Sequence, residues 1–279
     1  MSMETALFIE VKKAAGLWER LRSARTCFLA LDYDGTLAPF HHIRMEAYPL
    51  PGITDLIGKI RDKTGGAIAV ISGRPLAEVE HLLNVPGIMM VGSHGYEFRY
   101  PDGSMTVREP TARQRQGLGK AREADAIGGL GTRVEIKVGG IALHTRGMSV
   151  GEALSLEQRV HDSWTPIARL HDLEVRSFNG GIELRCPGTD KGGALKELLS
   201  RLREDTFSVY VGDDDTDEDA FRVVKDHGLG IRVGNPNEPT EASGFLPDIQ
   251  AVQEFLQGWV ALAPAGSSGG ITWKNEDWR

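Results

Sequence analysis

The sequence predicts an α/β protein in which a doubly wound parallel-sheet core is interrupted by an inserted α+β domain. Three observations carry this prediction. Short, solidly apolar runs alternate with segments of helical spacing in the N-terminal third, as expected of strands that helices cover on both faces. Between about Thr111 and Arg185 the strands instead alternate polar and apolar residues around two-residue hairpin signals. Beyond Lys191 the solidly apolar runs return.

The elements before the insertion follow one another in β-α-β-α-β order after a leading amphipathic helix. This order implies a parallel sheet with helices on both sides. The expected elements are helices over 5–22, 52–63 and 76–83, and strands over 27–31, 67–71 and 89–91.

The insertion reads as two hairpins and one long helix. The expected elements are strands over 132–138, 141–146, 173–178 and 181–186, and a helix over 150–170. With Gly139-Gly140 as the first loop, Glu135 lies opposite His144 and Arg133 opposite Arg146. With Asn179-Gly180 as the second loop, Arg176 lies opposite Glu183 and Glu174 opposite Arg185. The apolar face of the first hairpin is expected to pack on the helices; it carries Val134, Ile136, Val138, Ile141 and Leu143.

After the insertion we expect a helix over 195–202 and buried strands over 207–211 and 231–233. The domain boundaries follow from these changes of pattern. The core comprises 1–109 and 187–279, and the inserted domain comprises 110–186. Residues 264–279 are Gly/Ser-rich and then charged, so we expect a loosely held tail, in which Trp273 and Trp278 are the residues able to dock.

Composition excludes several classes of protein. The net charge is −7 and no lysine/arginine block stands out, which argues against a nucleic-acid scaffold. Cys27 and Cys186 are too few for a disulfide framework. No signal peptide or membrane-spanning run is visible. We therefore expect a cytoplasmic enzyme, without nucleic-acid or membrane partners, that is a monomer or a weak oligomer.

Polar residues follow several of the predicted core strands, where ligands bind in open α/β sheets. Asp32 and Asp34 end the first strand, Ser72 ends the second, and Lys191 follows the insertion. Residues i and i+2 of an extended chain lie on the same side, so the two aspartates repel each other. A cation between them and a phosphate substrate would make this arrangement favourable.

The strand over 207–211 runs into a second acidic segment, in which six of the seven residues 213–219 are acidic. Such a cluster needs a counter-charge, and a hard divalent cation with oxygen ligands is the obvious one; Mg²⁺ suits phosphate chemistry. The alternative is a solvated acidic loop at the start of a helix near Ala220. This alternative suits Asp215, Asp217 and Asp219 better than Asp213, which directly follows the strand and a glycine.

Together these segments resemble the four motifs of the haloacid dehalogenase (HAD) superfamily, whose core is Rossmann-like and whose larger, C2-type cap is inserted between motifs two and three. The resemblance implies that Asp32 is the nucleophile that forms an aspartyl-phosphate and that Asp34 is the general acid and then the base. It implies Mg²⁺ held by Asp32, the Asp34 carbonyl and Asp213, with Asp217 or Asp214 in or near its second coordination sphere. The implied phosphate-binding residues are Ser72, Gly73, Arg74 and Lys191; for Ser72 a helix N-cap is an equal alternative.

Segments of the insertion are similar to those of trehalose-6-phosphate phosphatases, among them Val134-Glu135-Ile136-Lys137 and Ile182-Glu183-Leu184-Arg185. The resemblance implies hydrolysis of trehalose 6-phosphate. It assigns sugar contacts to Glu135, Lys137 and Glu183, with Arg146, Arg176 and Asn179 as weaker candidates. A solvated polar sheet face explains the same residues. Phosphatases of sucrose or mannosyl-glycerate phosphates, a phosphomutase and a non-catalytic sugar-phosphate sensor remain alternatives.

Overall fold

The computed structural model describes residue 14, residues 16–178 and 180–266, and residue 273. The chain forms two compact units. The first, here called the core unit, is made of Met1–Thr106 and Lys191–Arg279, and the second, the cap unit, is Val107–Asp190. Among the described residues, no helix combines the length and the apolar character needed to cross a membrane.

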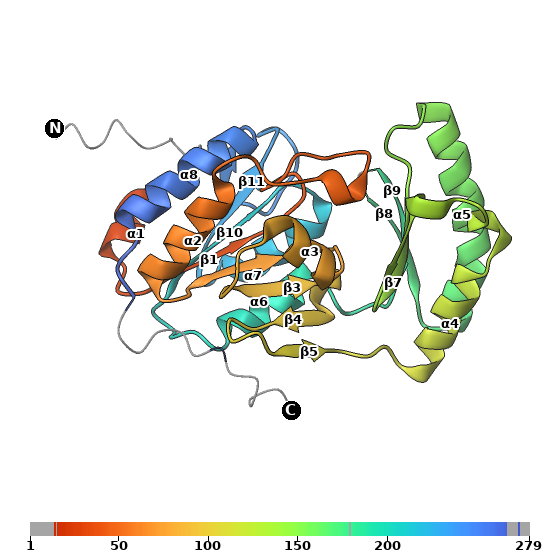
Figure 1. Cartoon of the computed structure of the whole chain (residues 1–279), viewed down its shortest axis with the longest axis horizontal. Helices are drawn as coiled ribbons and strands as arrows, with labels where there is room; N and C mark the ends of the chain where they lie inside the picture. The colour runs from red at the N-terminus through yellow and green to blue at the C-terminus, as the bar shows by residue number, and fades with distance from the viewer. Residues whose placement is uncertain (1–13, 15, 179, 267–272, 274–279) are drawn as a thin grey trace. The chain divides into compact units, whose positions relative to one another are not determined.

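The core unit is built on an eight-stranded sheet with the order β12-β11-β10-β1-β2-β3-β4-β5 (Figure 1). The strands from β12 to β3 pair in parallel, and β4 pairs antiparallel to β3. Their bounds are β1 Cys27–Leu31, β2 Ile68–Ile71, β3 Met89–Gly92, β4 Glu97–Arg99, β5 Met105–Val107, β10 Phe207–Gly212, β11 Gly228–Val233 and β12 Gly244–Leu246. The predicted parallel core is confirmed, and the antiparallel edge is an addition to it.

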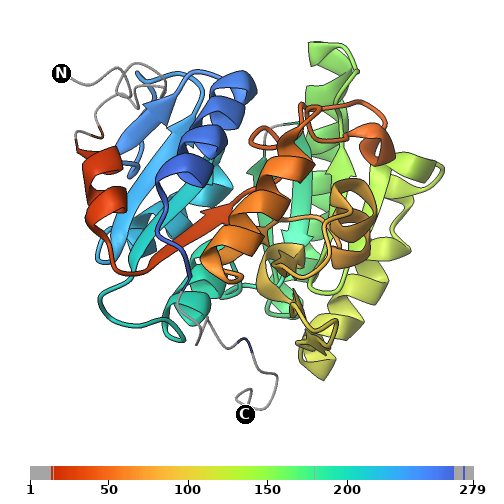
Figure 2. The same cartoon turned by 60° about the vertical axis from the view of Figure 1, so that its left-hand side comes forward.

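Helices cover both faces of this sheet, and the side chains that alternate along β1 show which helices lie on each face. Leu29 and Leu31 belong to the apolar cluster on the face of α1, α2, α3 and α8, whereas Phe28 and Ala30 belong to the cluster with α6 and α7. Figures 1 and 2 show α2 and α8 side by side. The bounds are α1 Leu17–Ser23, α2 Ile53–Thr64, α3 Leu76–Leu83, α6 Lys191–Leu199, α7 Glu218–Val224 and α8 Ile249–Leu262.

The register of β1 and β10 brings the two acidic segments together. Leu31 lies beside Val211, and the Asp32 amide donates to the Val211 carbonyl at 2.8 Å. Asp32 and Gly212 therefore leave the sheet side by side at its carboxyl edge, where open α/β sheets bind ligands.

The cap unit packs α4 (Ala112–Arg122) and α5 (Val150–Leu170) on an antiparallel sheet with the order β6-β7-β9-β8. The strands are β6 Val134–Lys137, β7 Gly140–His144, β8 Glu174–Phe178 and β9 Gly181–Arg185. Trp164 of α5 is fully buried and donates to the Ala121 carbonyl. The predicted α+β character of the insertion is confirmed.

The register of the first hairpin differs from the prediction, whereas that of the second is confirmed. Val138 and Gly139 form the first turn, so Glu135 lies opposite Ala142 instead of His144. The shift is two residues, which keeps every side chain on its predicted face. The edge position of β6 nevertheless leaves Ile136 43% exposed. In the second hairpin Arg176 lies opposite Glu183, and Glu174 lies opposite Arg185.

The chain ends differ in part from the expectation. Of the predicted helix over 5–22, only α1 lies within the described residues, and Trp278 lies outside them. Trp273 is buried, packs on Phe28 at 5.9 Å between ring centroids, and donates to the Gly66 carbonyl at 3.2 Å. At Trp273, therefore, the segment predicted to be a loose tail packs on the core unit.

Candidate active site

The side chain of Asp32 is held by a buried lysine. Asp32 is 5% exposed, and the Nζ atom of Lys191 lies 2.8 Å from its Oδ1 atom. Burial raises the pKa of Asp32 well above its usual value, and the charge of Asp217 adds to this, whereas Lys191 opposes it. Burial alone would lower the pKa of Lys191, but Asp217 and Asp32 raise it well above the usual value. Lys191 therefore stays charged beside the predicted nucleophile.

Asp217 is saturated by donors of the protein itself. Its Oδ1 atom accepts from Lys191 at 2.8 Å and from the Tyr210 hydroxyl at 2.6 Å, and its Oδ2 atom accepts from the amides of Asp213 and Asp214 at 3.0 and 3.1 Å. A side chain at Gly212 would collide with this carboxylate, since a Cβ atom there would lie 2.3 Å from its Cγ atom. Asp217 therefore holds Lys191 and the turn after β10 in place.

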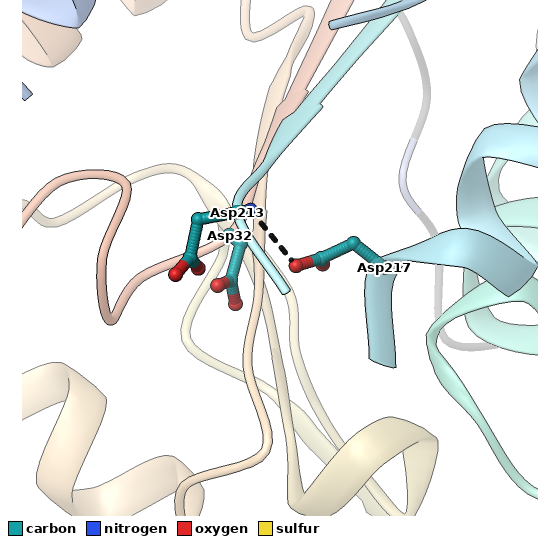
Figure 3. A group of neighbouring side chains, drawn as sticks. All are labelled: Asp32, Asp213 and Asp217. Atoms are coloured by element: carbon teal, nitrogen blue, oxygen red, sulfur yellow. Dashed lines mark hydrogen bonds between the residues drawn. The ribbon is translucent and has the colours of Figure 1, made fainter. Parts of the chain in front are cut away.

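Asp213 is the carboxylate without such partners. It converges with Asp32 and Asp217 so that one oxygen of each lies within 4.8 Å of the others (Figure 3). Within the described part of the chain, no protein group donates a hydrogen bond to its carboxylate. The carboxylate lies against the Cα atom of Gly35, where φ is +75° and a Cβ atom would come within 2.1 Å of Oδ2. Burial, followed by the charge of Asp32, raises the pKa of Asp213 to about 10.

This donor set fits a hard divalent cation. Asp32 and Asp217 contact the Lys191 ammonium group, and one carboxylate oxygen of Asp213 lies within 4.8 Å of an oxygen of each of them. Carboxylate oxygens are the ligands that Mg²⁺ takes. A cation between Asp32 and Asp213 would offset the charge of Asp32, which, after burial, raises the pKa of Asp213.

Other residues of the acidic run are engaged by groups of the protein itself. Glu218 accepts from Arg232 at 2.7 Å and from Thr240 and the Glu241 amide. Asp214 caps the 3₁₀ turn Asp215–Asp217 by accepting from Thr216. Arg222 donates to Asp219. These acids therefore build the turn and the start of α7.

Arg74 lies on Asp34, although the sequence predicted it at the phosphate. Its Nε and Nη2 atoms donate to the two Asp34 oxygens at 2.6 and 2.7 Å, a bidentate pair. Its Nη1 atom donates to the Arg44 carbonyl at 2.9 Å and lies 3.5 Å from Glu78. The guanidinium group of Arg74 is therefore engaged by other groups of the protein.

Ser72 and Gly73 lie where β2 ends. The Ser72 hydroxyl accepts from the Arg74 amide at 3.1 Å, so it caps the turn that leads into α3. Ser72 is buried, and its own amide donates to the Val91 carbonyl at 2.8 Å. The N-cap residue of α3 is Pro75, without a side-chain cap, so the helix N-cap alternative for Ser72 is wrong, and its phosphate contact stays a prediction.

In the cap unit the structure brings the three main sugar candidates together. Lys137 donates to Glu183 at 2.7 Å and lies 3.8 Å from Glu135, which is 2.8 Å from the Nε2 atom of His144. Lys137 and Glu183 stand on strands separated by β7. They meet because β7 carries only Gly140 and Ala142 between them. These four residues, Glu135, Lys137, His144 and Glu183, are called the cap cluster below.

The weaker candidates lie elsewhere or outside the described residues. Arg176 is 61% exposed and pairs with Glu174 at 3.2 Å. The side chain of Arg146 lies against Gly180 in the second hairpin turn, where a Cβ atom would come 2.5 Å from its Cγ atom. Asn179 lies outside the described residues.

Sequence reasoning missed Tyr210, which supports Asp217, and Arg232, which neutralises Glu218. A hydroxyl inside a solidly apolar strand was the available signal for Tyr210, because a buried tyrosine needs a hydrogen-bond partner. Arg232 likewise stands in a buried strand, where a charge needs a partner.

The fold of this chain, with these polar segments at the carboxyl edge of a doubly wound sheet, is similar to that of a solved phosphatase of the HAD superfamily from Bacteroides thetaiotaomicron, with a TM-score of 0.57 at 18% identity. Residues 30–250 match the trehalose-phosphatase family model, and the chain belongs to this family. The trehalose-phosphate phosphatase of Mycobacterium tuberculosis is 33% identical over an alignment of 253 positions that covers 84% of this chain and 60% of that protein. The chain thus spans about 60% of the length of such curated relatives.

Two solved structures resemble the chain in fold. The C-terminal domain of trehalose-6-phosphate phosphatase from C. albicans has a TM-score of 0.75 at 20% identity, covering 88% of this chain and 96% of that one. A trehalose-6-phosphate phosphatase related protein has a TM-score of 0.68 at 26% identity, and the match covers 84% of this chain and 97% of that one.

Proposed function

We propose that this chain hydrolyses trehalose 6-phosphate to trehalose and inorganic phosphate. Membership of the trehalose-phosphatase family supports the substrate. The observation that carries the chemistry is the placement of Asp32, which lies 2.8 Å from the buried Lys191 and next to the carboxylate of Asp213, to which no described residue donates a hydrogen bond. This arrangement suits a nucleophile that receives a phosphoryl group beside a fixed positive charge.

In the first step, an oxygen of Asp32 attacks phosphorus, and the bond from phosphorus to the sugar oxygen breaks. Asp34 gives its proton to the departing sugar oxygen, which yields trehalose and an aspartyl-phosphate at Asp32. Lys191 offsets the negative charge that gathers on the phosphoryl oxygens. The Ser72 hydroxyl and the Gly73 amide are the proposed hydrogen-bond donors to the phosphoryl group.

In the second step, Asp34 takes a proton from water as the water oxygen attacks the phosphorus of the aspartyl-phosphate. The bond from phosphorus to the Asp32 oxygen breaks, and inorganic phosphate and the free carboxylate result. Arg74 serves as a positioning residue here, because its bidentate pair fixes the Asp34 carboxylate. Each Asp34 oxygen keeps lone-pair sites for a substrate or water proton.

Mg²⁺ would be held by the carboxylates of Asp32 and Asp213 and by the main-chain carbonyl of Asp34, where it would neutralise charge on the phosphoryl group. Asp217 supports this set from outside, because its oxygens are already engaged by four protein donors.

The cap cluster is the proposed recognition site for the disaccharide. Sugar hydroxyls both donate and accept hydrogen bonds, and the cluster offers two carboxylates, an ammonium group and an imidazole. Arg146, Arg176 and Asn179 remain weaker proposals for the same role. A monomeric or weakly oligomeric cytoplasmic enzyme likewise stays a prediction.

Phosphate release across a set of sugar phosphates, with Mg²⁺ and with EDTA, tests the proposal. We expect Mg²⁺-dependent release from trehalose 6-phosphate, with smaller kcat/KM values for sucrose 6-phosphate and glucose 6-phosphate. An isomerised sugar phosphate would indicate a phosphomutase. Binding of trehalose 6-phosphate without any phosphate release would indicate a sensor.

A further inference from the structure

A buried histidine that the mechanism does not use stands at the end of β3, on a strained stretch of backbone. Ser93, His94 and Gly95 form a 3₁₀ turn, η3, and have φ values of 49°, 57° and 112°. Two adjacent non-glycine residues in the left-handed region are unfavourable, and such strain clusters at functional sites. His94 is only 9% exposed.

Hydrogen bonds fix this backbone to the loop that follows β2. The His94 amide donates to the Ser72 carbonyl at 3.0 Å, and the Ser93 amide donates to the Arg74 carbonyl at 2.7 Å. The Ser93 hydroxyl donates to Glu97, whose carboxylate also accepts from the Leu76 amide. The turn and the loop that carries Ser72 and Arg74 are therefore one hydrogen-bonded assembly.

The imidazole fills the space that a side chain at residue 73 would occupy. A Cβ atom on Gly73 would lie 2.5 Å from Cε1 and 2.6 Å from Nε2 of His94. Gly73 has no left-handed φ, so the ring alone excludes other residues there. A small residue at 94 and an alanine at 73 would fill this space without strain. The chain instead carries a glycine and a strained histidine, which points to a use for the imidazole.

The same ring lies near two further parts of the site. The turn η3 contacts α6, the helix that begins with Lys191. Burial raises the pKa of Asp214, but Lys191, Thr216 and the charge of His94 together lower it. His94 thus packs on the Ser72-Gly73 loop, stands in a turn that contacts α6, and acts electrostatically on Asp214 in the turn after β10.

We propose that His94 is a positioning residue for phosphoryl transfer, whose ring sets the Ser72-Gly73 loop relative to Lys191 and the turn after β10. This inference rests on the proposed function. It assigns His94 no contact with the reacting atoms; the ring acts through the loop on which the phosphoryl group is held.

The strained backbone at His94 allows a role in positioning to be distinguished from a role in folding. His94→Gly removes the ring and also relieves the left-handed backbone, so the melting temperature should stay unchanged or rise. We expect kcat for p-nitrophenyl phosphate and for trehalose 6-phosphate to fall about 10²-fold, the effect of a misplacement of about 1 Å. His94→Asn, which tolerates the left-handed region, should retain part of kcat.

Asn84→Gly is the matched control. Asn84 caps α3 in the same left-handed region, with a φ of 49°, so glycine is accommodated there too and should leave kcat unchanged. A second test addresses the contact itself. Gly73→Ala should lower the melting temperature because its Cβ atom meets the ring, and adding His94→Gly should restore it.

Wild-type kcat in His94→Gly would overturn the proposal. A loss of melting temperature parallel to the loss of activity would also overturn it, since His94 would then serve folding. A wild-type chain active on p-nitrophenyl phosphate but not on trehalose 6-phosphate would refute the proposed substrate and leave the His94 test intact. Inactivity on both would refute both proposals.

Discussion

Replacing Asp213 by asparagine is expected to stabilise the metal-free protein and to abolish its stabilisation by Mg²⁺. Asp213 has no donor among the described residues and lies beside the carboxylate of Asp32. Asparagine keeps the shape of the side chain and removes the charge. The substitution therefore isolates the electrostatic penalty that a cation would relieve.

The size of the effect follows from the pKa of Asp213, which burial and Asp32 raise from 3.8 to about 10. At pH 7 the unfolded carboxyl group is ionised, whereas the folded one takes up a proton. The unfolded carboxyl group has a pKa of 3.8, so protonating Asp213 on folding at pH 7 works against the difference between pH 7 and this pKa. Each pH unit of that difference costs about 1.36 kcal/mol, so the free energy of unfolding is lowered by at most about 4 kcal/mol. Burying a poorly partnered carboxamide costs about 1–3 kcal/mol, so the expected net gain is about 1–3 kcal/mol.

The pH dependence has a defined sign. The folded pKa is raised, so the contribution of Asp213 to stability is fully present below pH 3.8 and is lost as pH rises toward about 10. In EDTA the unfolding free energy of the wild type should fall across this range more steeply than that of Asp213→Asn.

Urea unfolding in EDTA and in Mg²⁺ measures the effect, with Asp217→Asn as the control. Mg²⁺ at a hundred times its Kd should stabilise the wild type by about 2.7 kcal/mol and Asp213→Asn by almost nothing. Asp217→Asn breaks a buried ion pair with Lys191 and should lose about 3–5 kcal/mol in both media. If Asp213→Asn is less stable than the wild type in EDTA, or keeps its Mg²⁺ response, the reasoning is wrong.

Three further predictions concern activity. Asp32→Asn should abolish phosphate release while circular dichroism stays unchanged; normal turnover would exclude Asp32 as the nucleophile. Glu135→Ala and Lys137→Ala should lower kcat/KM for trehalose 6-phosphate about tenfold or more beyond any loss on p-nitrophenyl phosphate, and equal losses would argue against sugar recognition. Arg74→Lys replaces the fork on Asp34 by a single contact, so kcat should fall about 10²-fold with the Mg²⁺ stabilisation retained; an unchanged kcat would contradict positioning.

Sequence patterns predicted the core closely because its strands are buried on both faces. The helix over Leu76–Leu83 and the strand over Cys27–Leu31 have their predicted bounds. The register of the first hairpin was wrong because Val138-Gly139 and Gly139-Gly140 are both acceptable two-residue loops. Both leave the same residues facing the same way, so the hydrophobic pattern does not discriminate a two-residue shift.

The sequence allowed us to predict the positions of the site residues that lie at strand ends. It did not allow us to predict which of several oppositely charged residues a given charged side chain pairs with. Asp32, Lys191 and Asp213 converge as the order of the motifs implies. The pair between Arg74 and Asp34 depends on two loops that are forty residues apart in the chain, and spacing along the sequence does not reveal it. The same holds for Arg232 and Glu218, which meet only through the packing of β11 beside α7.

The two aspartates at the end of β1 illustrate how folding gives different roles to similar side chains. Asp32 is 5% exposed and faces an ammonium group, Lys191, which Asp217 also holds. Asp34 is 24% exposed and faces a guanidinium fork, Arg74. A single point charge beside Asp32 leaves room for a second cation and an incoming phosphoryl group. A bidentate fork fixes both oxygens of Asp34 in one plane, which supports the proposal that this carboxylate exchanges a proton along one direction.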